Sequence, residues 1–179
     1  MPEHRNHRQH RYLWVLIICL PLQSFGQQAA DSRPGIFKVR DIVIYEDARF
    51  HAAFPSAVRT DDGEIIVAFR RAPDRKVFAE PGTSHVDPNS YLVHVTSADG
   101  IRWEQAPRLI YAHPFGGSQD PCLLKLRDGT LLCSSYGWAF VRPEAMANLK
   151  RPYFESNPGV VFLGGYILRS LDTGKTWHD

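Results

Sequence analysis

An eight-residue pattern, S-x-D-x-G-x-T-W, at Ser170–Trp177 restricts the possible folds of this chain more than any other segment. A weaker copy of the pattern runs from Ser97 to Trp103. Ser and Asp side chains hydrogen-bond nearby backbone groups and close a tight turn, and Gly174 can adopt a positive φ. The Trp is predicted to pack between sheets, where its burial contributes about 2–3 kcal/mol. One copy alone could be a calcium-binding loop of the D-x-D-x-G kind, but two copies indicate a repeated turn between strands.

The segments that precede these turns also repeat. Residues 54–67 align with residues 120–133 without a gap, and each copy has a Pro, an apolar strand, an Asp-Gly turn and a second apolar strand. Asp-Gly between apolar runs is a strong hairpin signal. Residues 91–97 and 165–170 are predicted as the strands that lead into the two Ser-Asp turns, and Trp103–Ala112 as a fourth strand. Four strands in a unit of about 70 residues are typical of a β-propeller blade.

The predicted fold is therefore all-β, a partial β-propeller of about two four-stranded blades. Both faces of a blade are buried, which accounts for the continuous apolar run Ile65–Phe69. Pro143–Lys150 is predicted as a short helix, and Ile36–Tyr45 as a lone strand before the first blade. Because propellers close with about four to eight blades, we expect an N-terminal fragment of a longer protein. Its apolar sheet faces would favour self-association.

Residues 1–26 have the features of a secretory signal peptide. A basic start, Met1–Arg11, is followed by the apolar run Tyr12–Leu22 and by small residues at Ser24–Gly26. The apolar run is shorter than the about 20 residues of a spanning helix. Residues 27–179 would then be the mature domain, an incomplete propeller that is secreted or periplasmic.

Composition excludes several classes of function. The net charge of +2 includes the basic leader, and the rest has no basic stripe for nucleic acid and no membrane segment. Cys122 and Cys133 fall on the two strands of one predicted hairpin, where they could share a face. A strained cross-strand disulfide and two free thiols are the alternatives, and the strain favours thiols. The sequence contains no C-x-x-C, H-E-x-x-H or G-x-S-x-G motif, and we expect no metal and no cofactor.

The repeats resemble those of the bacterial sialidases (exo-α-sialidases, neuraminidases) and their Asp-box propeller relatives. The resemblance covers residues 36–177 and rests on the two Asp boxes, on Phe54–Ala57 with its hairpin, and on Gly117–Pro121. It implies a six-bladed propeller that cleaves terminal sialic acids with retention of configuration. The implied machinery is a Tyr nucleophile paired with Glu, an Asp acid/base and three Arg that bind the substrate carboxylate.

Carried over residue by residue, the resemblance gives an incomplete active site. Ala53 stands where the first carboxylate-binding Arg is expected, and Arg49 lies nearby at the wrong spacing. The acid/base candidates are Asp87 and Asp74, both in the loop over residues 70–90. Asp87 matches better in position, although an Asp before Pro is also an ordinary turn residue.

The substrate-binding candidates are Asp120, which could instead cap a strand, and Arg71. His85 and His94 are interpreted as a loop residue and a strand residue. Three tyrosines are not assigned as the nucleophile, because none has a suitable Glu: Tyr136, Tyr153 and Tyr166.

Two functions are consistent with these residues. The first is the N-terminal part of a secreted sialidase-like glycoside hydrolase that acts on a sialoside or a related sugar, and that is inactive as this fragment. The second is a non-catalytic Asp-box propeller that binds glycans or proteins, since Asp boxes indicate a fold and not an activity. Ala53 favours the second or an altered specificity, whereas Asp87 and Asp120 favour the first.

Overall fold

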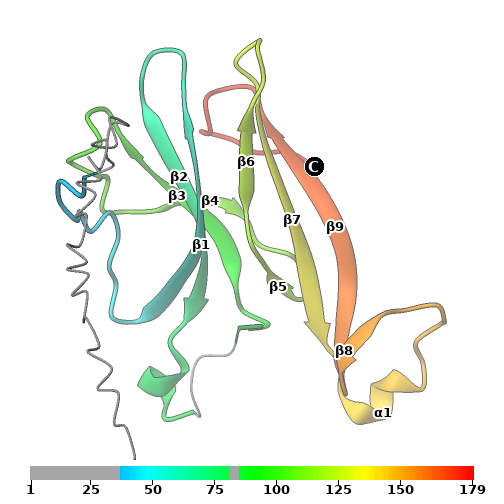
Figure 1. Ribbon diagram of the computed structural model, residues 1–179. Helices are drawn as coiled ribbons and strands as arrows, with labels where there is room; N and C mark the ends of the chain where they lie inside the picture. Colours follow the sequence, from blue (N-terminus) through cyan, green and yellow to red (C-terminus); the bar gives the residue numbers. More distant parts are fainter. Residues whose placement is uncertain (1–36, 81–84) are drawn as a thin grey trace, which may run out of the picture. The chain divides into compact units, whose positions relative to one another are not determined.

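The computed structural model describes residues 37–80 and 85–179, of which Arg40–Asp179 form one compact unit. The structure is mostly β-sheet, in two antiparallel sheets (Figure 1). The expected signal peptide, residues 1–26, lies outside the described residues. Among the described helices, none has the length and apolar character needed to cross a membrane.

The first sheet is a four-stranded antiparallel meander in which each strand pairs with the next one along the chain. The first two strands form the predicted Asp-Gly hairpin, and a 3-10 turn, η1, follows the second. The fourth strand is shorter than the predicted one. The elements are β1 (Phe50–Arg59), β2 (Ile65–Pro73), η1 (Arg75–Phe78), β3 (Tyr91–Ser97) and β4 (Arg108–Tyr111).

The second sheet is built around β7, which pairs with β9 on one side and with β5 and β6 on the other. Of the predicted helix at 143–150, only its first part is helical, as α1. The strand predicted at 165–170 begins earlier and is longer. The elements are β5 (Gly117–Ser118), β6 (Cys122–Lys125), β7 (Leu131–Phe140), α1 (Pro143–Met146), β8 (Glu155–Asn157) and β9 (Val160–Ser170).

The predicted lone strand at 36–45 is wrong over its described part, because residues 37–47 form no strand. Ile44 and Tyr45 instead pack their side chains against the outer face of the first sheet. Side-chain packing without a backbone ladder satisfies the apolar pattern of this segment, and the pattern alone does not specify a pairing partner.

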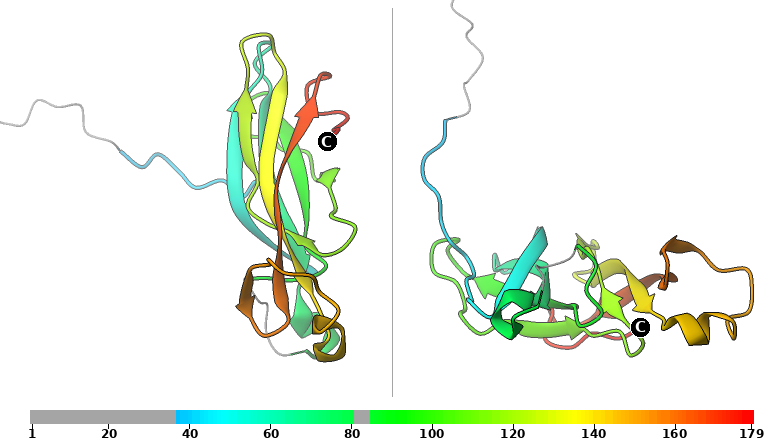
Figure 2. Two further views of the ribbon diagram at one scale, coloured as in Figure 1. Left: turned by 90° about the vertical axis from the view of Figure 1, so that its right-hand side faces the viewer. Right: turned by 90° about the horizontal axis from the view of Figure 1, so that it is seen from below.

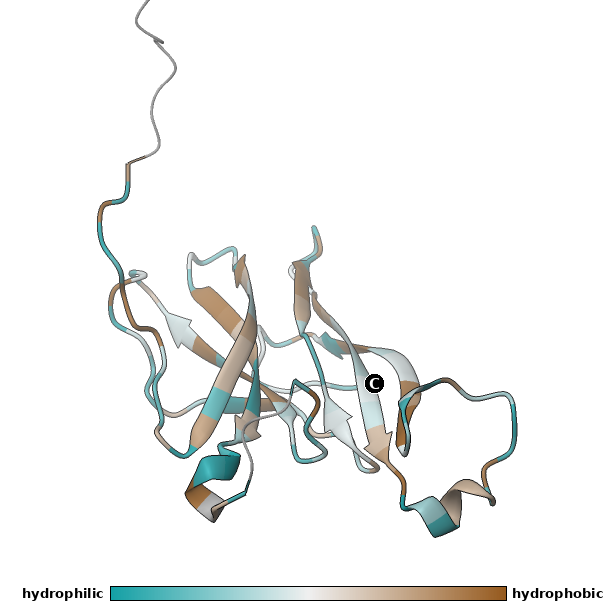
Figure 3. Cartoon of the chain, turned by 60° about the horizontal axis from the view of Figure 1, so that its bottom comes forward, coloured by the Kyte–Doolittle hydropathy of each residue, from teal (hydrophilic) through white to brown (hydrophobic). Residues whose placement is uncertain are grey.

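The two sheets pack against each other through a shared core, and in the left view of Figure 2 the long strands of both run in roughly the same direction. Along β2, Ile66 and Ala68 point into the core between the sheets, whereas Val67 and Phe69 point to the outer face, which Ile44 and Tyr45 cover. Both faces of β2 are buried, as the continuous apolar run Ile65–Phe69 predicts. Figure 3 shows hydrophobic segments along the strands. The core between the sheets contains Ile66, Ala68, Leu92, Ile110, Leu123, Leu131, Cys133 and Leu168.

The Ser-Asp pattern at 170–177 forms the tight turn predicted from the sequence. Asp172 Oδ1 accepts hydrogen bonds from the Ser170 hydroxyl (2.8 Å) and the Thr176 N–H (2.9 Å), and Ser170 Oγ accepts one from the Gly174 N–H (2.8 Å). Gly174 has a φ of 89°. Trp177 packs on the core between the sheets.

The turn at 97–103 is closed in the same way, but its Trp faces elsewhere. Asp99 Oδ1 accepts from the N–H groups of Ile101 and Arg102, each at 2.8 Å. Trp103 packs on the outer face of the first sheet and not between the two sheets. The local turn therefore follows from the sequence pattern, whereas the surface that its Trp covers depends on the neighbouring elements.

His94 on β3 connects the first sheet to the Ser-Asp turn that follows β9 of the second sheet. Its Nε2 atom donates to the Gly174 carbonyl oxygen at 3.0 Å, and the ring is fully buried. Burial lowers the pKa of His94, although the hydrogen bond to Gly174 opposes this shift. A neutral, buried strand histidine agrees with its sequence interpretation.

Both cysteines that the structure describes are free thiols on opposite faces of the second sheet. Leu123 pairs with Cys133 across the β6–β7 ladder, so Cys122 points to the other face, where it is exposed. The shared face considered for these residues is therefore wrong. Burial, with a smaller effect of Cys122, raises the pKa of Cys133 to about 12.

Candidate functional site

The two sheets are joined at one end by close backbone contacts between the loop before β3 and the short strand β5. The Ser118 N–H donates to the Ser90 carbonyl oxygen at 3.0 Å, and the Ser90 hydroxyl donates to the Ser118 carbonyl oxygen at 2.7 Å. A β-carbon on Gly117 would lie 1.8 Å from the Asp87 carbonyl oxygen. Only glycine fits there. Because it has no side chain, the loop before β3 can lie close to β5, and polar groups of both sheets come together.

Arg70, near the end of β2, is the most deeply buried charge at this junction. Its side chain is 1 % exposed, and no other described residue hydrogen-bonds its Nε or Nη2 atom. Burial lowers the pKa of Arg70, while Asp87 and Asp120 raise it through their charges. A guanidinium with unused donors in a buried position is costly unless an acceptor reaches it. Arg70 was not among the sequence candidates, although it follows directly on an apolar run that marks a buried strand.

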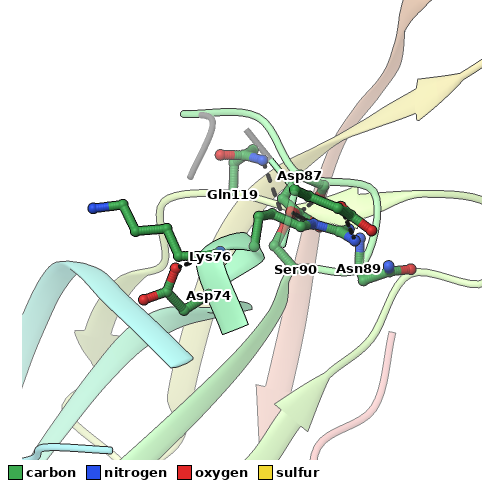
Figure 4. Close-up of polar contacts among 8 residues, drawn as sticks. Asp74, Lys76, Asp87, Asn89, Ser90 and Gln119 are labelled. Carbon is green, nitrogen blue, oxygen red and sulfur yellow. Dashed lines mark hydrogen bonds and ion pairs between the residues drawn. The ribbon is translucent and has the colours of Figure 1, made fainter. Parts of the chain in front are cut away.

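Asp87 is held in place by Arg75, the first residue of η1. Arg75 Nε and Nη2 donate to the two Asp87 carboxylate oxygens at 2.7 and 2.9 Å, and the Asn89 N–H adds a third bond at 2.8 Å. Asp87 is 2 % exposed, and burial raises its pKa, but the bonds from Arg75 and Asn89 outweigh this and lower it. Figure 4 shows Asp87 and Asn89 near Ser90 and Gln119. Here Asp87 is an ionised anchor, and its assignment as the proton donor stays a prediction.

Asp120, just before β6, pairs with a tyrosine on β7. The Tyr136 hydroxyl donates to Asp120 Oδ2 at 2.9 Å, and the Asp120 Oδ1 atom is buried without a hydrogen-bond partner among the described residues. Burial, and then the hydrogen bond to Asp120 and its charge, raise the pKa of Tyr136 to about 12. Tyr136 is therefore a neutral phenol near pH 7, and its exclusion as the nucleophile stays a prediction.

The other two sequence candidates make contacts with other residues. Asp74 caps η1 by accepting from the Lys76 N–H at 3.0 Å (Figure 4). Arg71 points to the opposite face of β2 from Arg70, where it bonds Asp47 at 3.0 Å and stacks 3.6 Å from the centre of the Phe50 ring. The structure thus brings together Asp87 and Asp120 of the predicted residues, adds Arg70 and Tyr136, and leaves out Arg71 and Asp74.

The group at the junction, Arg70, Asp87, Asp120 and Tyr136, is called the Arg70 cluster below. Among residues 37–80 and 85–179, no group of three or more His, Cys, Asp or Glu side chains could hold a metal ion. The open hydrogen-bonding atoms of the cluster are the Arg70 donors and the Asp120 Oδ1 acceptor. Such a pair suits a ligand that has both a carboxylate and hydroxyl groups.

Comparison with known proteins identifies similarity to solved structures. No protein-family model matches the chain, and no curated protein matches it. A crystal structure of a protein of unknown function from Dyadobacter fermentans DSM 18053 matches 82 % of the chain with 66 % identity and a TM-score of 0.77. The chain spans 40 % of the length of that protein. At this identity the two proteins share the described fold, and the relative is the longer of the two.

Proposed function

We propose that this chain is the N-terminal part of a secreted, sialidase-like glycoside hydrolase, and that the Arg70 cluster forms part of its pocket for an acidic sugar. Its two sheets would be the first two blades of a six-bladed propeller, preceded by a signal peptide. The two Asp-box turns, the sheet-on-sheet packing and the greater length of the Dyadobacter relative support this proposal. The outer face of the second sheet, which exposes Leu124 and Ile167, would contact the next blade or a second copy.

The observation that carries the proposal is the buried guanidinium of Arg70, whose Nε and Nη2 atoms have no hydrogen-bond partner among the described residues. Two buried guanidinium nitrogens without acceptors are destabilising in the unliganded protein. A sugar carboxylate would supply a negative charge and two acceptor oxygens in the planar geometry that Arg binds best. Asp120 Oδ1 would accept a hydrogen bond from a sugar hydroxyl beside it.

A binding protein without hydrolase activity is the second candidate, and the state of Asp87 favours it. A general acid needs a raised pKa, whereas the bonds from Arg75 and Asn89 lower the pKa of Asp87. The same cluster would then hold an acidic glycan and leave it intact. A fluorogenic sialoside assay on the longer Dyadobacter protein separates the two candidates, because turnover supports the hydrolase and binding without turnover supports the binding protein.

Binding of N-acetylneuraminic acid should depend on Arg70 and not on its neighbour Arg71. Because Lys lacks the planar fork, we expect Arg70→Lys to weaken binding at least about tenfold, or about 1.4 kcal/mol. Arg71→Lys, on the opposite face of the same strand, should leave the affinity within about twofold. Titrations followed by NMR measure both, with circular dichroism to check the fold. Equal affinity in Arg70→Lys and the parent chain would contradict the proposal.

A separate expectation concerns catalysis: the isolated chain should not turn over a fluorogenic sialoside.

A further inference from the structure

The first sheet contacts the Ser-Asp turn, residues 170–177, through a single carbonyl oxygen that holds two rings. His94 Nε2 donates to the Gly174 carbonyl oxygen at 3.0 Å, and Trp177 Nε1 donates to the same oxygen at 3.1 Å. The turn lies directly against the imidazole, since a β-carbon on Gly174 would be 3.7 Å from His94 Cε1. The position of the turn, and of the Trp177 ring that packs on the core, therefore depends on His94.

The buried imidazole has no partner for a second proton. Because Nε2 carries the hydrogen that is donated to the carbonyl oxygen, the neutral ring has a lone pair on Nδ1, and no described residue hydrogen-bonds that atom. His94 is fully buried, so protonation would place a positive charge and an unpaired N–H donor between the sheets. Both costs disappear only when the ring reaches water, which requires the turn to leave the first sheet.

The charged groups around His94 do not remove this cost. Burial has the largest effect on the pKa of His94 and lowers it, and the charge of Arg108, the β4 residue that pairs with His94, lowers it further. Glu104, before β4, and Glu64, in the β1–β2 hairpin, act in the opposite direction through their charges, but neither hydrogen-bonds Nδ1. The net effect is a pKa below the ordinary value of 6.5.

The turn offers the ring only its backbone. The Asp172 carboxylate is bonded within the turn, to Ser170 and Thr176, and the side chain of Lys175 is exposed. A histidine of the unfolded chain takes up a proton near pH 6.5. The stability that neutral His94 contributes is therefore complete above this pH and is lost as the pH falls below it.

We propose that His94 is a pH-sensitive link between the two sheets, closed while its ring is neutral and opened in acid. In the open state the bond between His94 and Gly174 is broken, the ring is protonated in water, and the turn leaves the first sheet together with Trp177. This inference concerns the packing of the two sheets, and it does not depend on which ligand the Arg70 cluster binds.

The first test compares the parent chain with His94→Gln, whose side-chain amide can donate to Gly174 but takes up no proton between pH 7 and pH 5. Chemical denaturation followed by circular dichroism gives the unfolding equilibrium constant at each pH. Between pH 7 and pH 5 this constant should rise at least about tenfold more in the parent chain than in His94→Gln, because the proton binds only after opening. His51→Gln is the control, since His51 on β1 is exposed, and it should match the parent chain within about twofold.

The second test locates the opening by NMR-detected hydrogen exchange in the parent chain. From pH 7 to pH 5 the protection of the Trp177 indole N–H and of the Gly174 amide, which donates to Ser170 Oγ, should fall at least about tenfold. The Ser118 amide, which joins the sheets at the Arg70 cluster, should change by less than about twofold.

The inference is overturned if His94→Gln and the parent chain have the same pH dependence. It is also overturned if the turn keeps its protection at pH 5, or if Ser118 loses as much protection as Gly174. Should His94→Gln fail to fold, the exchange measurement on the parent chain decides alone, and loss of protection confined to the turn supports the link.

Discussion

Replacing Gly117 with alanine should destabilise the chain by at least about 3 kcal/mol, at the upper end of the range for overpacked sites. The added β-carbon would lie 1.8 Å from the Asp87 carbonyl oxygen and 2.6 Å from Ser90 Oγ. Neither atom can retreat easily, because Ser90 is hydrogen-bonded to Ser118 and Asp87 is held by Arg75. Relief of the clash would separate the two sheets where the Arg70 cluster forms. Chemical denaturation followed by circular dichroism measures the loss.

Gly165→Ala is the matched control. Gly165 lies on β9 in the same sheet, but its β-carbon would meet only the Ser135 carbonyl oxygen at 3.6 Å, an ordinary contact. Its φ is not in the positive region, so alanine should change stability by less than about 1 kcal/mol. Equal losses in the two variants would show that the junction at Gly117 is not packed as described.

The second large effect is expected for Arg75→Met, which leaves the Asp87 carboxylate buried without its partner. Removing one member of a buried ion pair costs about 3–5 kcal/mol, because the remaining charge is uncompensated. Asp87→Asn added to Arg75→Met should recover part of the loss by removing that charge. Glu80→Gln is the control, since Glu80 also pairs with Arg75 but is 51 % exposed, and it should cost less than about 1 kcal/mol.

The pH dependence of this loss has a definite sign. In the parent chain the folded-state pKa of Asp87 is lowered below its ordinary value of 3.8, so the ion pair stabilises the fold above that pH and is lost as the pH falls further. In Arg75→Met, burial dominates and raises the folded-state pKa. The destabilisation should therefore be largest near pH 7 and shrink toward pH 4. A difference that grows on acidification would contradict the ion-pair geometry.

Local signals in the sequence predicted most of the strands. The Asp-Gly hairpins and the Ser-Asp turns each depend on residues within one short segment, such as Asp172 with Ser170 and Thr176. The continuous apolar run along β2 is also a local signal, and both faces of that strand are covered. The two-residue strand β5 escaped prediction, since Gly117 and Ser118 have no strand pattern and their pairing partners lie on β7, a segment about 20 residues further along the chain.

The candidate site was predicted only in part, for a physical reason. Asp87 and Asp120 were found by their match to positions in the family that the repeats resemble, but their partners come from other segments. Arg75 reaches Asp87 because η1 turns the chain back toward it, and Arg70 reaches the cluster because even positions on β2 face the second sheet. By the same alternation Arg71 faces the outer side, so one residue along a strand separates a site residue from a structural one.

A crystal structure of the chain with N-acetylneuraminic acid tests the central claim most directly. We expect the sugar carboxylate within hydrogen-bonding distance of Arg70 Nε and Nη2, and a sugar hydroxyl donating to Asp120 Oδ1. The claim is contradicted if, at saturating concentration, the sugar binds on another surface. It is also contradicted if Arg70 Nε and Nη2 bond only protein atoms and no sugar lies at the junction.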